Sequence, residues 1–132
     1  MIDKKISDEV RGFIGRHIES VGKLETFLLL VRAPERSWRA SEIASELRSS
    51  ENSVKKFLNE LHHASLVQID PTNPSAYRYR PETAGPAVEE LVIAFAVLQS
   101  RVIEIICNRS MTRIQNFANA FRLRKESDDD ST

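Results

Sequence analysis

The chain has 132 residues, enough for one compact domain with an accessory element and too few for two ordinary domains. Its composition, 41% hydrophobic and 29% charged with four glycines and five prolines, excludes a fibrous or largely disordered protein. The 19 basic and 19 acidic residues cancel, which argues against a uniformly basic nucleic-acid-binding surface.

The neutral total hides an uneven distribution of charge. Residues 101–125 contain six basic residues and one acidic residue, a net charge of +5. Residues 126–132 add four acidic side chains and are expected to form a disordered acidic tail. A basic C-terminal segment therefore lies beside an acidic one.

The cysteine content and the apolar runs indicate a cytoplasmic location. Cys107 is the only cysteine and cannot form an internal disulfide, and we expect it to be a small core residue. The polar N-terminal segment lacks the apolar core of a signal peptide. The most apolar run, 91–106, is interrupted by polar and charged residues and is too short and too polar to span a membrane.

Two helices are expected at the start of the chain. Ser7 is a candidate N-cap for a short helix in an N-terminal unit, residues 1–19. Ser20 is a candidate N-cap for a second helix over 21–35, which Pro34 ends. Apolar residues cover much of the circumference of that second helix, so we expect it to lie at the centre of the fold.

A short run around Trp38, which should be at least half buried, leads into two more helices. Ser41 is the expected N-cap of the first, residues 42–48. Ser49 and Ser50 should form the turn and the next N-cap. The second helix then carries apolar residues on one side at helical spacing: Val54, Phe57, Leu58 and Leu61.

Two strand-like runs follow, separated by Asp-Pro-Thr-Asn-Pro-Ser, and predict a β-hairpin. In the second run, alternation places Arg78 and Arg80 on one face and Tyr77 and Tyr79 on the other. Pro81 ends this strand.

From Thr83 we expect one long, coiled-coil-like helix. Six of its apolar residues, hereafter the apolar seam, follow alternating steps of three and four: Val88, Leu91, Phe95, Leu98, Val102 and Ile105. Such a seam either covers the core of its own domain or pairs with the same helix of a second chain, and the regular spacing favours a symmetric homodimer. A joint is expected at Asn108, Arg109 and Ser110, and a final amphipathic helix after it, with apolar residues at 111, 114, 117, 118 and 121.

The central residues resemble the winged helix–turn–helix family, as in MarR-, ArsR- and PadR-type regulators. The run 42–47, "EIASEL", is similar to the first helix of the motif, with Ala44 where a small residue lets the two helices cross. "YRYRPE" is similar to the returning strand of the wing. The family often has glycine at the positions of Arg48 and Ser65, where the backbone needs positive φ. The resemblance covers residues 20–82 and implies a mainly α fold with a small hairpin wing, followed by a dimerisation segment, 83–125.

This resemblance implies contact with double-stranded DNA through the second helix of the motif and the wing. Asparagine can bond to adenine, whereas serine, lysine and arginine reach phosphate or guanine. The candidate DNA-binding residues are Ser50, Asn52, Ser53, Lys55, Lys56, Asn59, Arg78 and Arg80.

The charge balance leaves a second function open. Residues 20–82 carry nine basic and eight acidic side chains, so this domain should bind DNA weakly unless a dimer presents two copies to a palindromic site. The sequence therefore predicts a dimeric transcriptional regulator. The alternative is a winged-helix module that binds a protein partner and has little affinity for DNA.

No pattern in the sequence indicates catalysis, a cofactor or a metal. His62 and His63 are adjacent on a helix and point in different directions, so they cannot share a metal ion. The chain has no glycine-rich phosphate loop and no nucleophile motif. We expect a protein that is not an enzyme.

Overall fold

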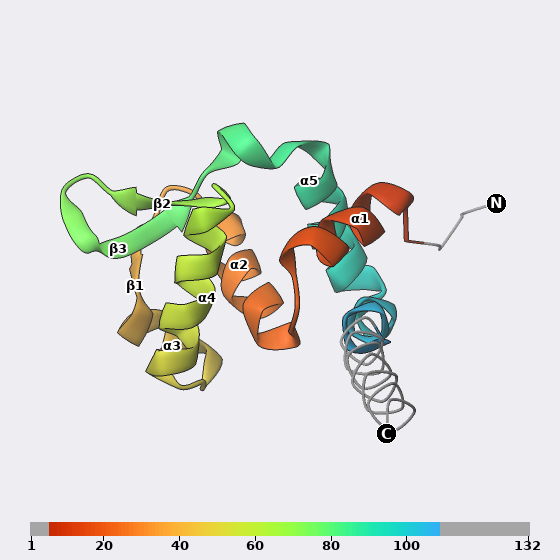
Figure 1. The fold of residues 1–132 in the computed structure, drawn as a ribbon, viewed down its shortest axis with the longest axis horizontal. Coiled ribbons are helices and arrows are strands. Elements are labelled where there is room, and N and C mark those ends of the chain that lie inside the picture. The colour runs from red at the N-terminus through yellow and green to blue at the C-terminus, as the bar shows by residue number, and fades with distance from the viewer. Residues whose placement is uncertain (1–5, 109–132) are drawn as a thin grey trace, which may run out of the picture.

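The computed structural model describes residues 6–108, apart from the side chains of residues 83 and 84. These residues form a mainly helical fold with a small three-stranded antiparallel sheet, which confirms the fold class at this level and is compatible with a winged helix (Figure 1). A further helical stretch covers 99–108. The labelled elements are α1 (Asp8–His17), α2 (Val21–Arg32), β1 (Trp38–Arg39), α3 (Ala40–Leu47), α4 (Glu51–His63), β2 (Val67–Asp70), β3 (Asn73–Tyr79) and α5 (Pro81–Val97).

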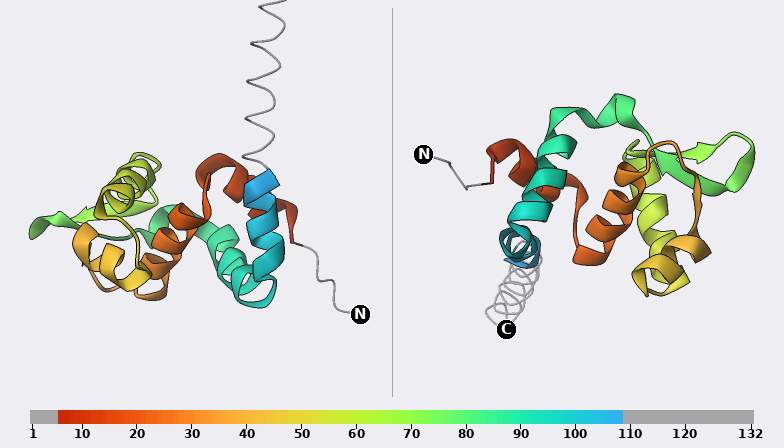
Figure 2. Two further views of the ribbon diagram at one scale, coloured as in Figure 1. Left: turned by 90° about the horizontal axis from the view of Figure 1, so that it is seen from below. Right: turned by 180° about the vertical axis from the view of Figure 1, so that it is seen from behind.

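The views from three sides agree on the arrangement of these elements (Figures 1 and 2). Helices α3 and α4 and the sheet occupy one end of the molecule, α1, α5 and residues 99–108 occupy the other, and α2 lies between them. One cluster of buried side chains extends through both ends. In the described part of the chain, no helix is long and apolar enough to cross a membrane.

The two predicted N-caps at the start of the chain are confirmed. The side chain of Ser7 accepts a hydrogen bond from the backbone N–H of Val10 at 3.2 Å, and Ser20 accepts one from Lys23 at the same distance. Helix α2 is central, as expected, with its apolar side chains at 0% exposure: Leu24, Phe27, Leu28 and Leu30.

Helix α3 begins earlier than the sequence predicts. The expected N-cap, Ser41, lies inside the helix, and Arg39 takes the cap position. The carboxylate of Glu42 accepts the backbone N–H of Arg39 at 2.8 Å, so a side chain of the first turn satisfies the helix end. The arginine side chain has no acceptor and makes no cap of its own, so Glu42 supplies the side-chain hydrogen bond at this helix start. Trp38, just before it, is only 5% exposed, as predicted.

Two residues adopt the left-handed conformation at the positions where the resemblance called for glycine. Arg48, at the end of α3, has φ 54°, and Ser65, after α4, has φ 63°. Both residues adopt a backbone conformation that glycine would adopt at a lower cost in free energy. The two departures from the family's glycines therefore leave the backbone conformation at these turns left-handed.

The sheet has the strand order β1–β3–β2, and all neighbours are antiparallel. The predicted hairpin is formed by β2 and β3, which are joined at Pro71–Thr72. The pairing register of β2 and β3 shifts between Ile69 and Asp70: Ile69 pairs with Tyr77, whereas Asp70 pairs with Asn73. Pro74 lies in this irregular part, where a missing backbone N–H does no harm to regular pairing.

The predicted long C-terminal helix is interrupted, and in the described residues the expectation of one continuous helix is wrong. Gly85 has φ 67° and ψ −169°, and α5 ends at Val97, followed by the C-cap Leu98, whose φ and ψ are −123° and 44°. Residues 99–108 then form a separate helical stretch (Figure 2). The predicted final helix and the acidic tail 126–132 lie outside the described residues.

The apolar seam lies largely in the core of its own chain. Helix α5 packs against α1, and Ser7 donates a hydrogen bond to Glu90 at 2.6 Å. Leu98 and Ile105 are half buried. Four of the six seam residues are at most 8% exposed in the single chain: Val88, Leu91, Phe95 and Val102. Of the two roles left open for the seam, the structure supports internal packing, and the seam is not a free surface for dimerisation.

Candidate nucleic-acid interface

The exposed side of α4 presents most of the predicted DNA contacts. Val54, Leu58 and Leu61 are at most 1% exposed and hold the opposite side of this helix against the core. The residues Asn52, Lys55, Lys56 and Asn59 are exposed, and Ser53 is half buried. Apart from Asn59, these side chains come from the first half of α4, which follows the turn from α3 directly (Figure 1).

Ser50 and Ser53 serve the helix end itself. The Ser50 hydroxyl accepts the backbone N–H of Ser53 and donates to the Ser53 hydroxyl, both at 3.0 Å. The predicted N-cap at Ser50 is confirmed, and both hydroxyls are already bonded. Their main contribution is therefore to orient the first turn of α4 rather than to offer unbonded polar groups.

The two lysines of α4 differ in their surroundings. The Lys55 ammonium lies 3.5 Å from the Glu51 carboxylate, one turn earlier on the same exposed face. Within residues 6–108 no ion pair of Lys56 is found, and this side chain is exposed. An exposed pair such as Glu51–Lys55 contributes little stability, so a phosphate can replace the carboxylate at small cost.

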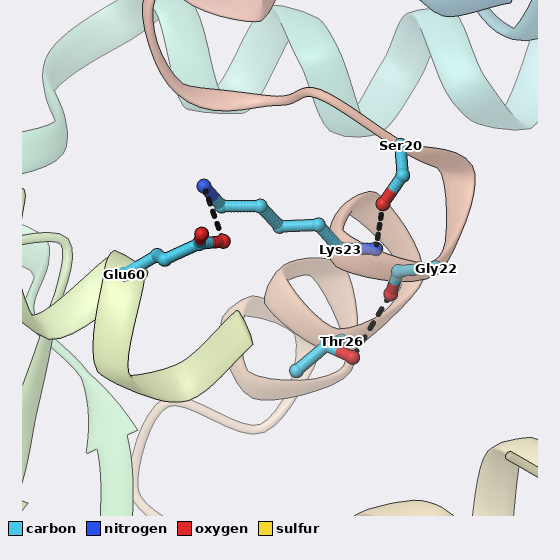
Figure 3. A network of polar contacts seen from close by, with 5 residues as sticks. All are labelled: Ser20, Gly22, Lys23, Thr26 and Glu60. Carbon is cyan, nitrogen blue, oxygen red and sulfur yellow. Dashed lines mark hydrogen bonds and ion pairs between the residues drawn. The ribbon is translucent and has the colours of Figure 1, made fainter. Parts of the chain in front are cut away.

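Glu60, which the sequence places on the same helix as the lysines, is directed away from them. Its carboxylate pairs with the ammonium of Lys23 on α2 at 3.3 Å (Figure 3). The Lys23 side chain is 7% exposed and that of Glu60 is 34% exposed. The negative charge of Glu60 is therefore paired with Lys23, away from the exposed side of α4 that carries Lys55 and Lys56.

Close packing of α2 on α4 supports this pair. Phe57 of α4 lies over Gly22 of α2, and a Cβ at Gly22 would stand 3.1 Å from its ring. The Thr26 hydroxyl is bonded to the Gly22 carbonyl at 2.9 Å (Figure 3). The missing side chain at Gly22 lets the two helices approach beside Lys23 and Glu60.

The tyrosines of the hairpin pack against helices and the arginines do not, as the alternation along the strand predicts. Tyr79 meets the ring of Phe27 edge-on with centroids 5.9 Å apart, and Tyr77 meets His62 of α4 at 6.2 Å. These contacts seat β3 on α2 and on the last turn of α4. The hairpin projects beyond α4 at the same end of the molecule (Figure 1).

Arg78 is anchored along the hairpin, whereas Arg80 is exposed. With the Gln68 amide turned so that its oxygen faces Arg78, that oxygen accepts from Nε at 2.7 Å and from Nη2 at 3.1 Å. Arg80 lies just after β3, at the start of α5, so it is outside the strand proper. Both arginines therefore lie on or next to β3, but a side-chain contact holds only Arg78 in place.

Asp70 closes the hairpin turn and ties it to the strand before α3. Its carboxylate accepts the Ser37 hydroxyl at 2.5 Å and, through the other oxygen, the N–H and hydroxyl of Thr72, each at 2.8 Å. The bond from Ser37, followed by those from Thr72, lowers the pKa of Asp70 to about 2. The turn is therefore held by a carboxylate that stays ionised in acid.

Replacing Ser37 by alanine is expected to raise the pKa of Asp70 back toward 3.8, because the largest stabilising bond to the carboxylate is lost. Since the pKa is lowered in the folded state, the contribution of Asp70 to stability is complete above about pH 4 and is lost as the pH falls toward 2. NMR titration of the Asp70 carboxyl carbon measures the shift. An unchanged pKa in the Ser37→Ala variant would show that Ser37 is not the cause.

Two residues of this region were not among the predicted site residues. Arg48 is exposed in the turn that precedes α4, and its sequence position was recognised only as one that favours glycine. The role of Lys23 could not be predicted from the sequence, because no neighbouring residue indicates that a lysine on an apolar helix pairs with Glu60. The exposed basic residues near the start of α4 therefore include Arg48 as well as Lys55 and Lys56.

The remaining polar candidates do not assemble into a chemical site. In the described part of the chain, no three side chains of His, Cys, Asp or Glu lie close enough to hold a metal ion. Cys107 is exposed, so the expectation that it is a core residue is wrong, because Val102 and Ile106 face the core in its stretch of helix.

Comparisons of the chain with models of protein families, with curated proteins and with solved structures gave no significant match.

Proposed function

We propose that this protein is a dimeric, winged-helix transcriptional regulator that binds double-stranded DNA. Helix α4 would enter the major groove, with Asn52 and Asn59 facing base edges and Lys55 and Lys56 facing phosphates. The β2–β3 hairpin would be the wing, with Arg80 next to the DNA backbone and Arg78 held by Gln68.

The observation that carries this proposal is the exposed first half of α4. A helix that follows another helix after a short turn, with its apolar side buried and small polar and basic residues outward, fits the geometry of a recognition helix. The Lys23–Glu60 pair supports it further, because it withdraws a negative charge from the surface that would approach the phosphates.

Binding of the full chain to a random duplex should weaken steeply as salt rises, because phosphate contacts release counterions. The Lys55→Ala plus Lys56→Ala variant should bind at least about tenfold more weakly, and its log–log salt dependence should be shallower by about two. Fluorescence anisotropy from about 50 mM salt upward measures both effects. Selection from a random pool should yield a palindromic site with half-sites about one helical turn apart.

The matched control is Arg11→Ala plus Arg16→Ala, which removes the same two charges from α1 at the other end of the molecule (Figure 1). This variant should bind DNA like the unaltered chain. Equal losses in both variants would mean that overall charge, and not α4, determines binding.

A second function has specific support in the same region. Lys55 is already paired with Glu51, and Arg78 is bonded to Gln68, so half of the predicted basic contacts have partners inside the chain. These bonds fit a near-neutral surface that binds a protein. Absence of DNA binding by micromolar protein at about 50 mM salt would favour this function over the regulator.

A further inference from the structure

An open groove lies between α5, the end of α2 and the end of β3. Its volume is about 520 Å³, and its lining includes Glu89 and the apolar residues Val31, Tyr79, Val88, Val92 and Ile93. Ile93 and Val97 are one helical turn apart on α5 and are 63% and 69% exposed. An exposed apolar surface of this kind beside a groove is typical of a binding site.

Negative charge borders the groove. Burial raises the pKa of the Tyr79 hydroxyl, and the charges of Glu89 and Glu82 raise it further. Both carboxylates are thus close enough to act on a ring that lines the groove. Since no lysine or arginine is among the described residues of the lining, the groove fits an apolar ligand with positively charged flanks.

Residues 109–125 of this chain have that chemistry. The segment carries five basic residues and no acidic one, a net charge of +5. Its apolar residues, at 111, 114, 117, 118 and 121, recur at helical spacing. The apolar stripe with its flanking arginines therefore complements, in polarity and in charge, an apolar groove with flanking glutamates.

We propose that residues 109–125 of a second copy of the chain occupy this groove, and that two copies exchange these segments reciprocally. The described chain ends at Asn108, which lies beside Arg11 of α1, whereas the groove is lined by residues of α2, β3 and α5. Because only residues 109 and 110 connect Asn108 to the apolar stripe, we place the stripe in the groove of a second copy and not in the groove of its own chain. A reciprocal exchange closes a twofold dimer and fills both grooves.

This inference rests on the dimer of the proposed function and not on DNA binding. It also replaces the apolar seam as the dimer contact, because the seam is covered within each copy whereas Ile93 and Val97 are not. The interface would then consist of surface that the single chain leaves exposed.

Cross-linking between two distinguishable copies tests the exchange. In a Cys107→Ser background, one tagged chain carries Ala96→Cys, next to Ile93 and Val97, and the other carries Ala118→Cys in the apolar stripe. Under mild oxidation we expect a disulfide between the two copies. It should form at least about tenfold faster than with the control Ser45→Cys, which is exposed on α3.

Each other result would overturn the inference. Disulfides between two copies of Ala96→Cys would show that α5 pairs with α5. A link within one chain that carries both substitutions, in a monomer, would show that the segment folds back on its own groove. Cross-linking no faster than with the control would show that the segment does not occupy the groove at all.

Solution mass separates this inference from the proposed function. The full chain should be a dimer at about 10 µM, and Ile93→Asp should weaken self-association at least tenfold, since a charge would enter an apolar contact. Ser45→Asp should leave it unchanged, and thermal melts should show that both variants fold. A monomeric chain that binds DNA would contradict the dimer alone, whereas a dimer without the cross-link would contradict only the exchange.

Discussion

Replacing Leu91 by alanine is expected to destabilise the folded chain by about 3 kcal/mol. Leu91 is 0% exposed within a single copy, so its truncation leaves a cavity in the core where α5 meets α1. The loss should be the same in dilute and concentrated solution, because no second copy contributes to the burial. Urea denaturation over a hundredfold range of protein concentration measures both its size and its independence of concentration.

The matched control on the same helix is Ile93→Ala. Ile93 is 63% exposed, and at high dilution this substitution should change the free energy of unfolding by less than about 0.5 kcal/mol. A small effect of Leu91→Ala that grows with protein concentration would contradict internal packing of the apolar seam and would return the seam to the dimer interface.

Replacing Glu60 by leucine is expected to cost about 3 kcal/mol, because it leaves the Lys23 ammonium buried without its carboxylate. The Lys23 side chain is 7% exposed, so little of its ammonium is hydrated once the carboxylate is gone. The free energy of unfolding from urea denaturation measures the cost. The exposed Glu51→Leu variant is the control and should stay within about 0.5 kcal/mol of the unaltered chain.

The double variant Lys23→Met plus Glu60→Leu should recover most of that loss, since two apolar side chains of similar size replace the pair. A double variant as unstable as the sum of the single ones would show that the charges do not interact. DNA binding by the double variant should be unchanged, because this variant carries no negative charge at position 60 that would have to be kept away from the exposed side of α4.

Local features of this fold could be predicted from the sequence because their causes are local. Ser7, Ser20 and Ser50 cap helices through backbone groups three residues away, and Pro and Asn place the hairpin turn. The left-handed turns at Arg48 and Ser65 were predictable because the connections between the elements require them. The exposed residues of α4 followed from its apolar spacing.

Features that depend on distant partners could not be predicted. The spacing of the apolar seam is the same whether α1 or a second copy covers it, so only the position of α1 decides between them. The partner of Glu60 lies 37 positions earlier in the chain, on a helix that is otherwise apolar. The break at Leu98 has no proline or glycine to mark it. These features are set by packing between segments, which residue patterns do not reveal.

The contact between α1 and α5 has a consequence for the order in which the protein folds. Helices α2 to α4 and the hairpin pack with near neighbours in the chain, whereas Ser7 meets Glu90 across a separation of 83 residues. Contacts of such range require closure of a long loop and form late. During synthesis on the ribosome, part of the apolar face of α1 therefore stays uncovered until α5 emerges, and chaperones have their best access to the nascent chain in that interval.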